Sequence, residues 1–307
     1  MNNNPGLNII LNRIQEEILA ETGRIGIHCR IHARIKDIDS LKEKIDRKEK
    51  EGKGYSMEGK KVQDICGFRI TTYFIEDVKL LWDIFERKYK KVAESNDLIT
   101  QDNLSVFQPV HKNLVCRMSD ADTSILNEIK ANNDDIYQLI DNTFEIQFRT
   151  TFSEGWHEID HVLRYKCRSD WEDFLEESRM LNGIYATLET SDRALKSLFD
   201  DLSYQHYKKQ NWEAMLRTKF HLKFTKEPLD NDIYEIINRN KELAKGIFRI
   251  DRENVIKKIS QSNLNFPLSF NNLIYFLNFI ELKNHEIDQL LPQLLRIRFK
   301  NYLENEN

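Results

Sequence analysis

The sequence predicts an α+β fold in which a mixed five-stranded sheet flanked by helices is followed by an all-helical C-terminal domain. Three observations lead to this class. Segments of strand and helix periodicity alternate up to about residue 150, strand signals fade beyond about residue 151, and only 10 glycines and 5 prolines occur in 307 residues. We place the domain boundary near residue 200, so that residues 1–200 hold the sheet and residues 201–307 form the helical domain.

Composition and charge exclude several classes of protein. The 46 Lys and Arg against 50 Asp and Glu leave a net charge of -4, so any polyanion site must be local rather than spread over the whole surface. No apolar run approaches the roughly 18 residues of a membrane span, and the first ten residues, MNNNPGLNII, do not resemble a secretory signal. We therefore expect a cytoplasmic protein with no membrane partner.

The first two predicted elements differ in the spacing of their apolar residues. Apolar residues over 7–22 have helical spacing, and the chain then alternates strictly over 24–36, as in a strand with one apolar face. Because no acid shares the opposite face, its cations would repel one another unless an anion binds there, which favours an anion site. The residues of that face are Arg24, His28, Arg30, His32, Arg34 and Lys36.

Further elements follow in order. A charged helix is predicted over 37–50, a glycine-containing loop over 50–62, a strand over 64–74, and a helix from Asp77 with Val78, Leu81, Trp82 and Phe85 on one face. Strands near 106–118 and 143–150 extend the sheet. The remaining chain predicts helices over 151–166, 171–209, 211–220, 230–246, 252–262, 270–282 and 284–303.

Two carboxylates suggest a metal-dependent transfer site. The strand over 143–150 sends Glu145, Gln147 and Arg149 to the same face, and Asp64 begins the strand that contains Gly67. Carboxylates from neighbouring strands opposite a basic strand suit Mg²⁺-dependent phosphoryl or nucleotidyl transfer, because the metal bridges phosphate oxygens and the cations neutralise the remaining charge. We expect Mg²⁺ as the cofactor, with Asp64 and Glu145 as its ligands.

A competing motif indicates zinc. His157 to His161 match HExxH, in which two histidines on one helix face bind Zn²⁺ and Glu158 acts as general base. The third ligand would be Glu176, Glu177 or Glu189. A zinc hydrolase leaves the basic strand opposite the two carboxylates unexplained, so it is the remote alternative.

Four stretches resemble the motifs of one known family. Residues 34–44, RIKDIDSLKEK, are similar to RxKxxxSxxxK; residues 64–70, DICGFRI, to D-I-x-G-x-R-I; and residues 145–150, EIQFRT, to E-I-Q-I-R-T. Residues 156–166 are similar to W-x-x-x-E/D-H-x-L-x-Y-K, which explains HEIDH without zinc. In this order over 24–168 the motifs resemble the RelA/SpoT nucleotidyltransferase (alarmone synthetase) domain of the small, single-domain type.

The resemblance implies a nucleotidyltransferase-like sheet that transfers the β,γ-pyrophosphoryl group of ATP to a ribose 3'-hydroxyl, with AMP leaving. It implies Asp64 and Glu145 as catalytic and Mg²⁺-binding residues, with Glu145 also a candidate to accept the proton of the hydroxyl. It implies Arg34, Lys36, Ser40 and Lys44 at the ATP phosphates, Arg69 against adenine or phosphate, and as acceptor-binding residues Phe107, His111, Gln147, Arg149, His161 and Lys166.

The acceptor is left open between two substrates. The family's G-Y-x-S-x-H stretch aligns with residues 106–111, VFQPVH, which keep an aromatic ring in Phe107 and the histidine in His111 but lack the glycine. GDP or GTP would give (p)ppGpp, whereas the toxic small alarmone synthetases modify the tRNA 3' end in growth arrest or phage defence. An adenine nucleotide acceptor and a degenerate domain that only binds nucleotides also stay open.

The rest of the chain carries weaker expectations. Only about 23 residues precede the first predicted strand, so we expect synthesis without a hydrolase domain. The helical domain could mediate homo-oligomerisation or bind a regulatory or antitoxin partner. The alternative is a purely structural role, in which the helical domain packs against the catalytic domain.

Overall fold

The computed structural model describes residues 4–96, 112–133, 135–262 and 264–304, which divide into two compact units. The first contains Met1–Leu19 and Cys29–Asp192, and the second contains Ala20–His28 and Arg193–Asn307. Two helices, α1 (Pro5–Arg24) and α6 (Leu175–Lys208), have residues in both units. None of the helices in the described ranges combines the length and the apolar character needed to cross a membrane.

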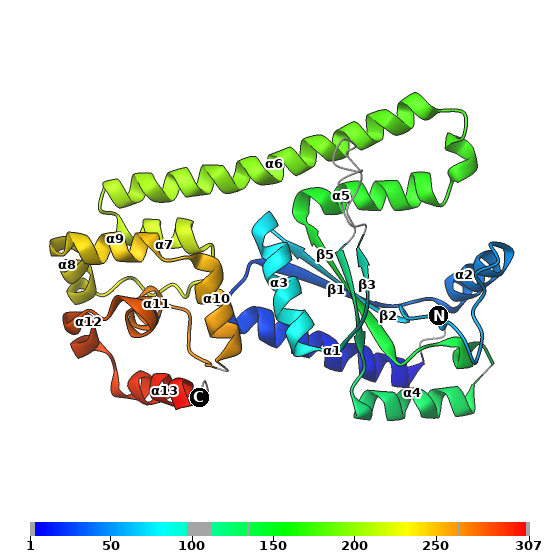
Figure 1. The fold of residues 1–307 in the computed structure, drawn as a ribbon, viewed down its shortest axis with the longest axis horizontal. Helices are drawn as coiled ribbons and strands as arrows, with labels where there is room; N and C mark the ends of the chain where they lie inside the picture. Colours follow the sequence, from blue (N-terminus) through cyan, green and yellow to red (C-terminus); the bar gives the residue numbers. More distant parts are fainter. Residues whose placement is uncertain (1–3, 97–111, 134, 263, 305–307) are drawn as a thin grey trace. The chain divides into compact units, whose positions relative to one another are not determined.

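A five-stranded mixed sheet forms the centre of the first unit (Figure 1). Its spatial order is β1-β2-β5-β4-β3; β2 and β5 run parallel, and each other neighbouring pair is antiparallel. This topology, together with the helical second unit, confirms the predicted α+β class. The strands are β1 (Cys29–Ile35), β2 (Cys66–Thr72), β3 (Lys91–Asn96), β4 (Lys112–Arg117) and β5 (Thr143–Thr150).

One face of the sheet is apolar and packs on helix α3 (Ile75–Lys88). The ring of Phe148 on β5 lies 5.6 Å from Trp82 and 6.3 Å from Phe85, both on α3. On the same face the rings of Phe68 and Phe144 meet edge to face at 5.7 Å. Burial of each such ring contributes about 1.5–3 kcal/mol to stability, and the predicted apolar face of this helix is confirmed.

The opposite face of the sheet is polar and is approached by helix α5 (Thr151–Ile159), which begins where β5 ends. Thr150 caps α5, because its hydroxyl accepts from the Ser153 amide while the Ser153 hydroxyl accepts from the Thr150 amide. The Thr150 hydroxyl also donates to Asp192 on α6 at 2.6 Å. These bonds fix the direction of α5. The other short elements of this unit are α2 (Ile38–Lys50), α4 (Asp120–Asn132), two 3₁₀ helices (Asp135–Leu139 and Arg168–Trp171) and a π-helix (Asp160–Tyr165).

The strand predicted from residue 24 begins later than expected. Helix α1 continues to Arg24, and Gly26 then adopts φ +71°, which interrupts the extended chain before β1 starts at Cys29. Arg24 therefore leaves the basic face; its guanidinium donates to the carbonyls of Ile259 and Ser260 in the second unit. Ile25 and Ile27 are both buried, so their spacing of two residues matches that of a strand although β1 starts only at Cys29.

The second unit is helical, as predicted, with more breaks than expected. Asn240 ends α8, and its side chain accepts from the Leu243 amide to begin α9, so the helix predicted over 230–246 is two helices. The helix predicted over 284–303 is broken at Leu291 and Pro292. The elements of the second unit after α6 are α7 (Trp212–Phe220), α8 (Asn231–Arg239), α9 (Lys241–Arg249), α10 (Arg252–Gln261), α11 (Phe270–Leu277), a π-helix (Asn278–Leu282), α12 (His285–Leu290) and α13 (Gln293–Glu304).

Candidate active site

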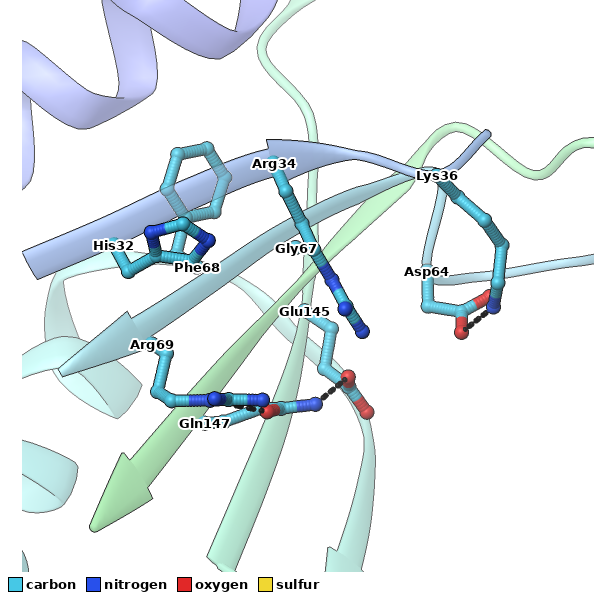
Figure 2. A pocket seen from close by; sticks show the side chains of 9 residues that line it. All are labelled: His32, Arg34, Lys36, Asp64, Gly67, Phe68, Arg69, Glu145 and Gln147. Atoms are coloured by element: carbon cyan, nitrogen blue, oxygen red, sulfur yellow. Dashed lines mark hydrogen bonds and ion pairs between the residues drawn. The ribbon is translucent and has the colours of Figure 1, made fainter. Parts of the chain in front are cut away.

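The strand register places basic and acidic side chains in rows across the polar face. Arg34 on β1 lies opposite Gly67 on β2, which lies opposite Glu145 on β5. Two residues along each strand, a second row follows on the same face. Together with residues at the strand ends, these rows line a cleft (Figure 2), whose lining residues are His32, Arg34, Lys36, Asp64, Gly67, Phe68, Arg69, Glu145 and Gln147.

Gly67 keeps the centre of the cleft open. Its φ is not in the left-handed region, so its role is space rather than backbone freedom. Figure 2 shows the Arg34 side chain lying across Gly67 with its guanidinium directed towards Glu145. A Cβ at residue 67 would meet Cγ of Arg34 at 3.9 Å, an ordinary contact.

This geometry predicts that Gly67→Ala folds normally, whereas Gly67→Val displaces Arg34. Because alanine fits and is favoured over glycine inside a strand, the free energy of unfolding of Gly67→Ala should change by less than about 1 kcal/mol. Valine adds two methyl groups under the Arg34 side chain and should weaken binding of ATP, the nucleotide expected from the sequence, about tenfold more than alanine does. Calorimetric titration with a non-hydrolysable ATP analogue and urea unfolding measure the two effects. Equal affinities for the two variants would contradict the assigned path of Arg34.

Asp64 is held by two ammonium groups at one end of the cleft. It accepts from Lys44 Nζ at 2.9 Å and forms a short ion pair with Lys36 Nζ. Burial alone would raise the pKa of Asp64, but Lys44 and Lys36 outweigh it and hold the pKa below its ordinary value. Asp64 is therefore ionised at neutral pH. Burial lowers the pKa of Lys36, whereas at Lys44 the attraction of Asp64 overcomes burial and raises the pKa.

Glu145 accepts its side-chain hydrogen bonds from two neutral amides. Asn113 Nδ2 on β4 donates to its Oε1 at 3.2 Å, and Gln147 Nε2 donates to its Oε2 at 2.8 Å. Donors that carry no charge orient the carboxylate without neutralising it. Mg²⁺ in nucleotide sites takes one or two carboxylates together with phosphate oxygens, so the donor set of Asp64 and Glu145 in one cleft fits that ion.

Arg69 is more constrained than expected. Its Nη1 pairs with Glu154 at 2.5 Å and forms a short ion pair with Glu158, both on α5, and its Nε donates to Gln147 Oε1 at 3.2 Å. Burial would lower the pKa of Arg69, but Glu158 and Glu154 raise it. The arginine predicted to contact adenine or phosphate is thus held in place by two acids on α5.

The structure brings some of the predicted site residues together and leaves others apart. In the part of the chain that is described, the predicted residues Arg34, Lys36, Asp64, Arg69, Glu145 and Gln147 line the cleft, and Lys44 joins them through Asp64. Ser40, Arg149, His161 and Lys166 are not among the lining residues. Phe107 and His111 lie outside the described residues.

These four residues have identifiable positions. Ser40 lies exposed in the first turn of α2, where its amide donates to Asp37 at 3.4 Å. Arg149 shares the face of Glu145 but is buried, with 7% of its surface exposed. His161 and Lys166 are exposed at the π-helix and the residue after it, and partial burial, Lys166 and Arg34 lower the pKa of His161. The acceptor-binding role of Arg149 stays a prediction.

The HExxH residues have separate environments. His157 is buried with its ring 5.3 Å from Trp156 and 5.8 Å from Tyr185, whereas the exposed His161 stacks on Tyr165. Glu158 pairs with Arg69. Over the described ranges, no group of three or more His, Cys, Asp and Glu side chains is arranged to hold a metal ion.

Several residues of the site were missed from the sequence alone. Asn113 bonds Glu145 from β4, and Glu154 and Glu158 hold Arg69 from α5. The i,i+4 spacing of the two glutamates on one helix face was a usable signal, but their partner lies far away in sequence. His32 lines the cleft, whereas the sequence predicts for it only a position on the basic face of the first strand.

Comparison with known proteins agrees with this arrangement. Residues 33–170 match the family described as "Region found in RelA / SpoT proteins", and this stretch contains each lining residue except His32. This part of the chain is similar to the RelA/SpoT family. A curated relative of the RelA/SpoT region, GTP pyrophosphokinase YjbM of Bacillus subtilis (strain 168), is 28% identical over 137 residues. The match covers 44% of this chain and 56% of YjbM, so the chain spans about half the length of that relative.

Solved structures of similar proteins include two from bacteria. A GTP pyrophosphokinase family protein from Streptococcus pneumoniae is 22% identical with a TM-score of 0.46, over 64% of this chain and 90% of that one. Small alarmone synthetase 1 from Bacillus subtilis, solved with its product pppGpp, is 17% identical with a TM-score of 0.45, over 63% of this chain and 93% of that one.

The four motifs of the RelA/SpoT region occupy continuous parts of the site. The first spans the end of β1 and the start of α2, the second includes most of β2, the third lies in β5, and the fourth spans the end of α5 and the π-helix after it. Because β1, β2 and β5 are adjacent in the sheet, motifs distant in sequence meet in one cleft.

Proposed function

We propose that this chain transfers the β,γ-pyrophosphoryl group of ATP to the 3'-hydroxyl of a guanine nucleotide, GDP or GTP, to form (p)ppGpp. The observation that carries the proposal is one cleft in which Asp64 and Glu145 oppose the cations Arg34, Lys36 and Lys44. A triphosphate with its metal ion needs both kinds of charge within one site. The family match over residues 33–170 supports the same activity.

The basic side of the cleft would bind the triphosphate. Lys36 and Lys44 converge on Asp64, so phosphate oxygens bound there would gain two ammonium partners, and Asp64 would be a ligand of the metal ion. Arg34, directed across Gly67, reaches towards Glu145 and would stabilise charge on the group in transfer (Figure 2). These cations reduce the repulsion between the phosphates and the two carboxylates.

The acidic side would carry the transfer. Mg²⁺, held by Asp64 and Glu145, would supply charge stabilisation to the phosphate oxygens. The acceptor 3'-oxygen forms a bond to the β-phosphorus, the bond from the β-phosphorus to the oxygen of the α-phosphate breaks, and AMP leaves. Glu145 would accept the hydroxyl proton: Asn113 and Gln147 each donate to one of its oxygens and orient the carboxylate, and each oxygen keeps a further lone pair for the proton.

A guanine nucleotide is the first choice of acceptor because the curated relative YjbM is named a GTP pyrophosphokinase. A second acceptor, the 3' end of tRNA, is favoured by a cluster of exposed cations on Tyr165. Arg168 lies 4.8 Å and Arg47 5.6 Å from its ring, and His161 stacks on it. Cations that flank an exposed aromatic ring are common features of sites for single-stranded nucleic acid.

One assay distinguishes the acceptors. Purified protein is incubated with γ-labelled ATP and Mg²⁺, and with GDP, GTP, or deacylated tRNA in parallel, then analysed by thin-layer chromatography and denaturing gel. We expect label in a guanine nucleotide, and loss of transfer when EDTA removes Mg²⁺. Label in tRNA alone would replace the first acceptor by the second. No transfer to any acceptor, with ATP bound, would contradict the proposed function.

A further inference from the structure

A continuous set of hydrogen bonds connects Glu145 to helix α5. Glu145 accepts from Gln147 Nε2 at 2.8 Å, and Gln147 Oε1 accepts from Arg69 Nε at 3.2 Å. Arg69 Nη1 then pairs with Glu154 at 2.5 Å and, through the short ion pair, with Glu158. The set crosses from β5 to β2 and ends on two acids that lie one helical turn apart.

We infer that Glu154 and Glu158 are positioning residues that set the orientation of Glu145 through Arg69 and Gln147. This inference rests on the proposed function, in which Glu145 binds the metal ion and accepts the proton. The side-chain amide of Gln147 has an acceptor end and a donor end, and only the donor end can bond a carboxylate. Arg69 can only donate, so it takes the oxygen and leaves the nitrogen to donate to Glu145.

The two acids prevent Arg69 from leaving this arrangement. A lone guanidinium beside Glu145 would gain by turning to that carboxylate directly, since a charged pair is stronger than a bond to an amide. Glu154 and Glu158 provide two carboxylates on the far side of Arg69, so the cation stays there and Glu145 keeps its neutral donors. Glu145 thereby keeps the orientation that its hydrogen bonds from Gln147 and Asn113 set.

The two acids should contribute unequally. The Glu154 side chain is 22% exposed and that of Glu158 52% exposed, while the Arg69 side chain is 21% exposed. An ion pair screened from water is the stronger constraint. Glu154 is therefore the principal anchor, and Glu158, at the more exposed end of the same helix, is the secondary one.

The test compares Glu154→Gln, Glu158→Gln and the double variant with Glu128→Gln, which removes the same charge from an exposed position on α4. We expect the double variant to lose roughly ten- to a hundredfold in kcat with a smaller change in the KM for ATP. Glu154→Gln should lose more than Glu158→Gln, and Glu128→Gln should match the wild type. Unchanged kcat in the double variant would overturn the inference.

A double-mutant cycle separates positioning from general stability. If the acids act through Gln147, their removal in a Gln147→Ala background should cost less than twofold further in kcat, because the connection is already broken. A purely structural role of α5 would give additive losses. Additive losses would therefore overturn the inference even if each single variant is impaired.

A second measurement does not depend on transfer activity. The side-chain amide signals of Gln147, assigned by comparison with Gln147→Ala, should shift in nitrogen-15 NMR spectra of the Glu154→Gln and Glu158→Gln double variant and stay in place in Glu128→Gln. Unmoved Gln147 signals in the double variant would contradict the inference. A wild-type protein without transfer activity would contradict the proposed function, and the NMR result would still decide the positioning role.

Discussion

Glu145→Gln should fold as the wild type does and lose at least about a hundredfold in pyrophosphoryl transfer. The substitution keeps the size of the side chain, but the neutral amide neither binds a metal ion well nor accepts the proton of the attacking hydroxyl. Asn113 and Gln147 both donate to Glu145 now, and the new NH₂ group would oppose one of these donors. A loss of stability of about 1 kcal/mol should accompany the loss of activity.

Initial rates with labelled ATP and urea unfolding curves measure the two effects together. Glu128→Gln on α4 is the matched control, since it removes one exposed carboxylate of the same chemistry from the same unit. A Glu145→Gln protein with full transferase activity would contradict the assigned role of Glu145 in metal binding and proton transfer.

Asp64→Asn should abolish transfer and also destabilise the fold, for an electrostatic reason. Lys36 and Lys44 both pair with Asp64, with 18% and 22% of their side chains exposed. Without the carboxylate, two ammonium groups face each other with only an amide between them. We expect a fall of about 1–3 kcal/mol in the free energy of unfolding at neutral pH, measured by urea unfolding.

The pH dependence of this effect has a definite sign. The folded pKa of Asp64 is lowered, because Lys44 and Lys36 outweigh burial. Its contribution to stability is therefore fully present above the unfolded pKa of about 3.9 and is lost as pH falls through the folded pKa. The difference in stability between the wild type and Asp64→Asn should shrink below about pH 4.

A compensating variant is the control for Asp64. In a protein that carries Lys36→Met and Lys44→Met, the change Asp64→Asn removes a carboxylate that no longer has its two partners. The loss of folding free energy caused by Asp64→Asn should be much smaller in that background than in the wild type, or reversed in sign. An equal loss of stability in both backgrounds would show that Asp64 stabilises the fold by some other contact.

The central sheet was predictable because its signals are local. Period-two alternation around Phe144, Ile146 and Phe148 reports burial on one face, and the apolar face of α3 follows from helical spacing. Strand β3 (Lys91–Asn96) had no such signal. Its sequence, KVAESN, has no apolar alternation, since it lies at the edge of the sheet and pairs only with β4 among the described strands.

The strand boundary at β1 required tertiary information. In the sequence, residues 24–28 continue the alternation of β1. In the structure, however, Arg24 donates hydrogen bonds to carbonyls of α10, and Gly26 adopts a left-handed conformation in a turn. The periodicity of Ile25 and Ile27 records burial in the second unit rather than a strand. Alternation alone does not distinguish these two origins.

Most residues of the candidate site were predictable from the sequence, but the contacts between them were less so. The sequence motifs identified Asp64, Glu145 and Gln147, which line one cleft. The register of β2 and β5 places Glu145 beside Gly67 and Gln147 beside Arg69. The partners of Arg69 on α5 were not predictable, because they depend on the direction in which Thr150 starts that helix. The burial of Arg149 on the polar face likewise depends on packing that no local pattern reports.

The most direct test of the proposed activity uses ATP labelled on its β-phosphate, with Mg²⁺ and GDP or GTP. Pyrophosphoryl transfer carries the β-label to the guanine nucleotide and releases one unlabelled AMP for each acceptor modified. We predict that result for the wild type and its loss in Glu145→Gln. Retention of the β-label in ADP, with only the γ-phosphate transferred or released, would contradict the proposed reaction.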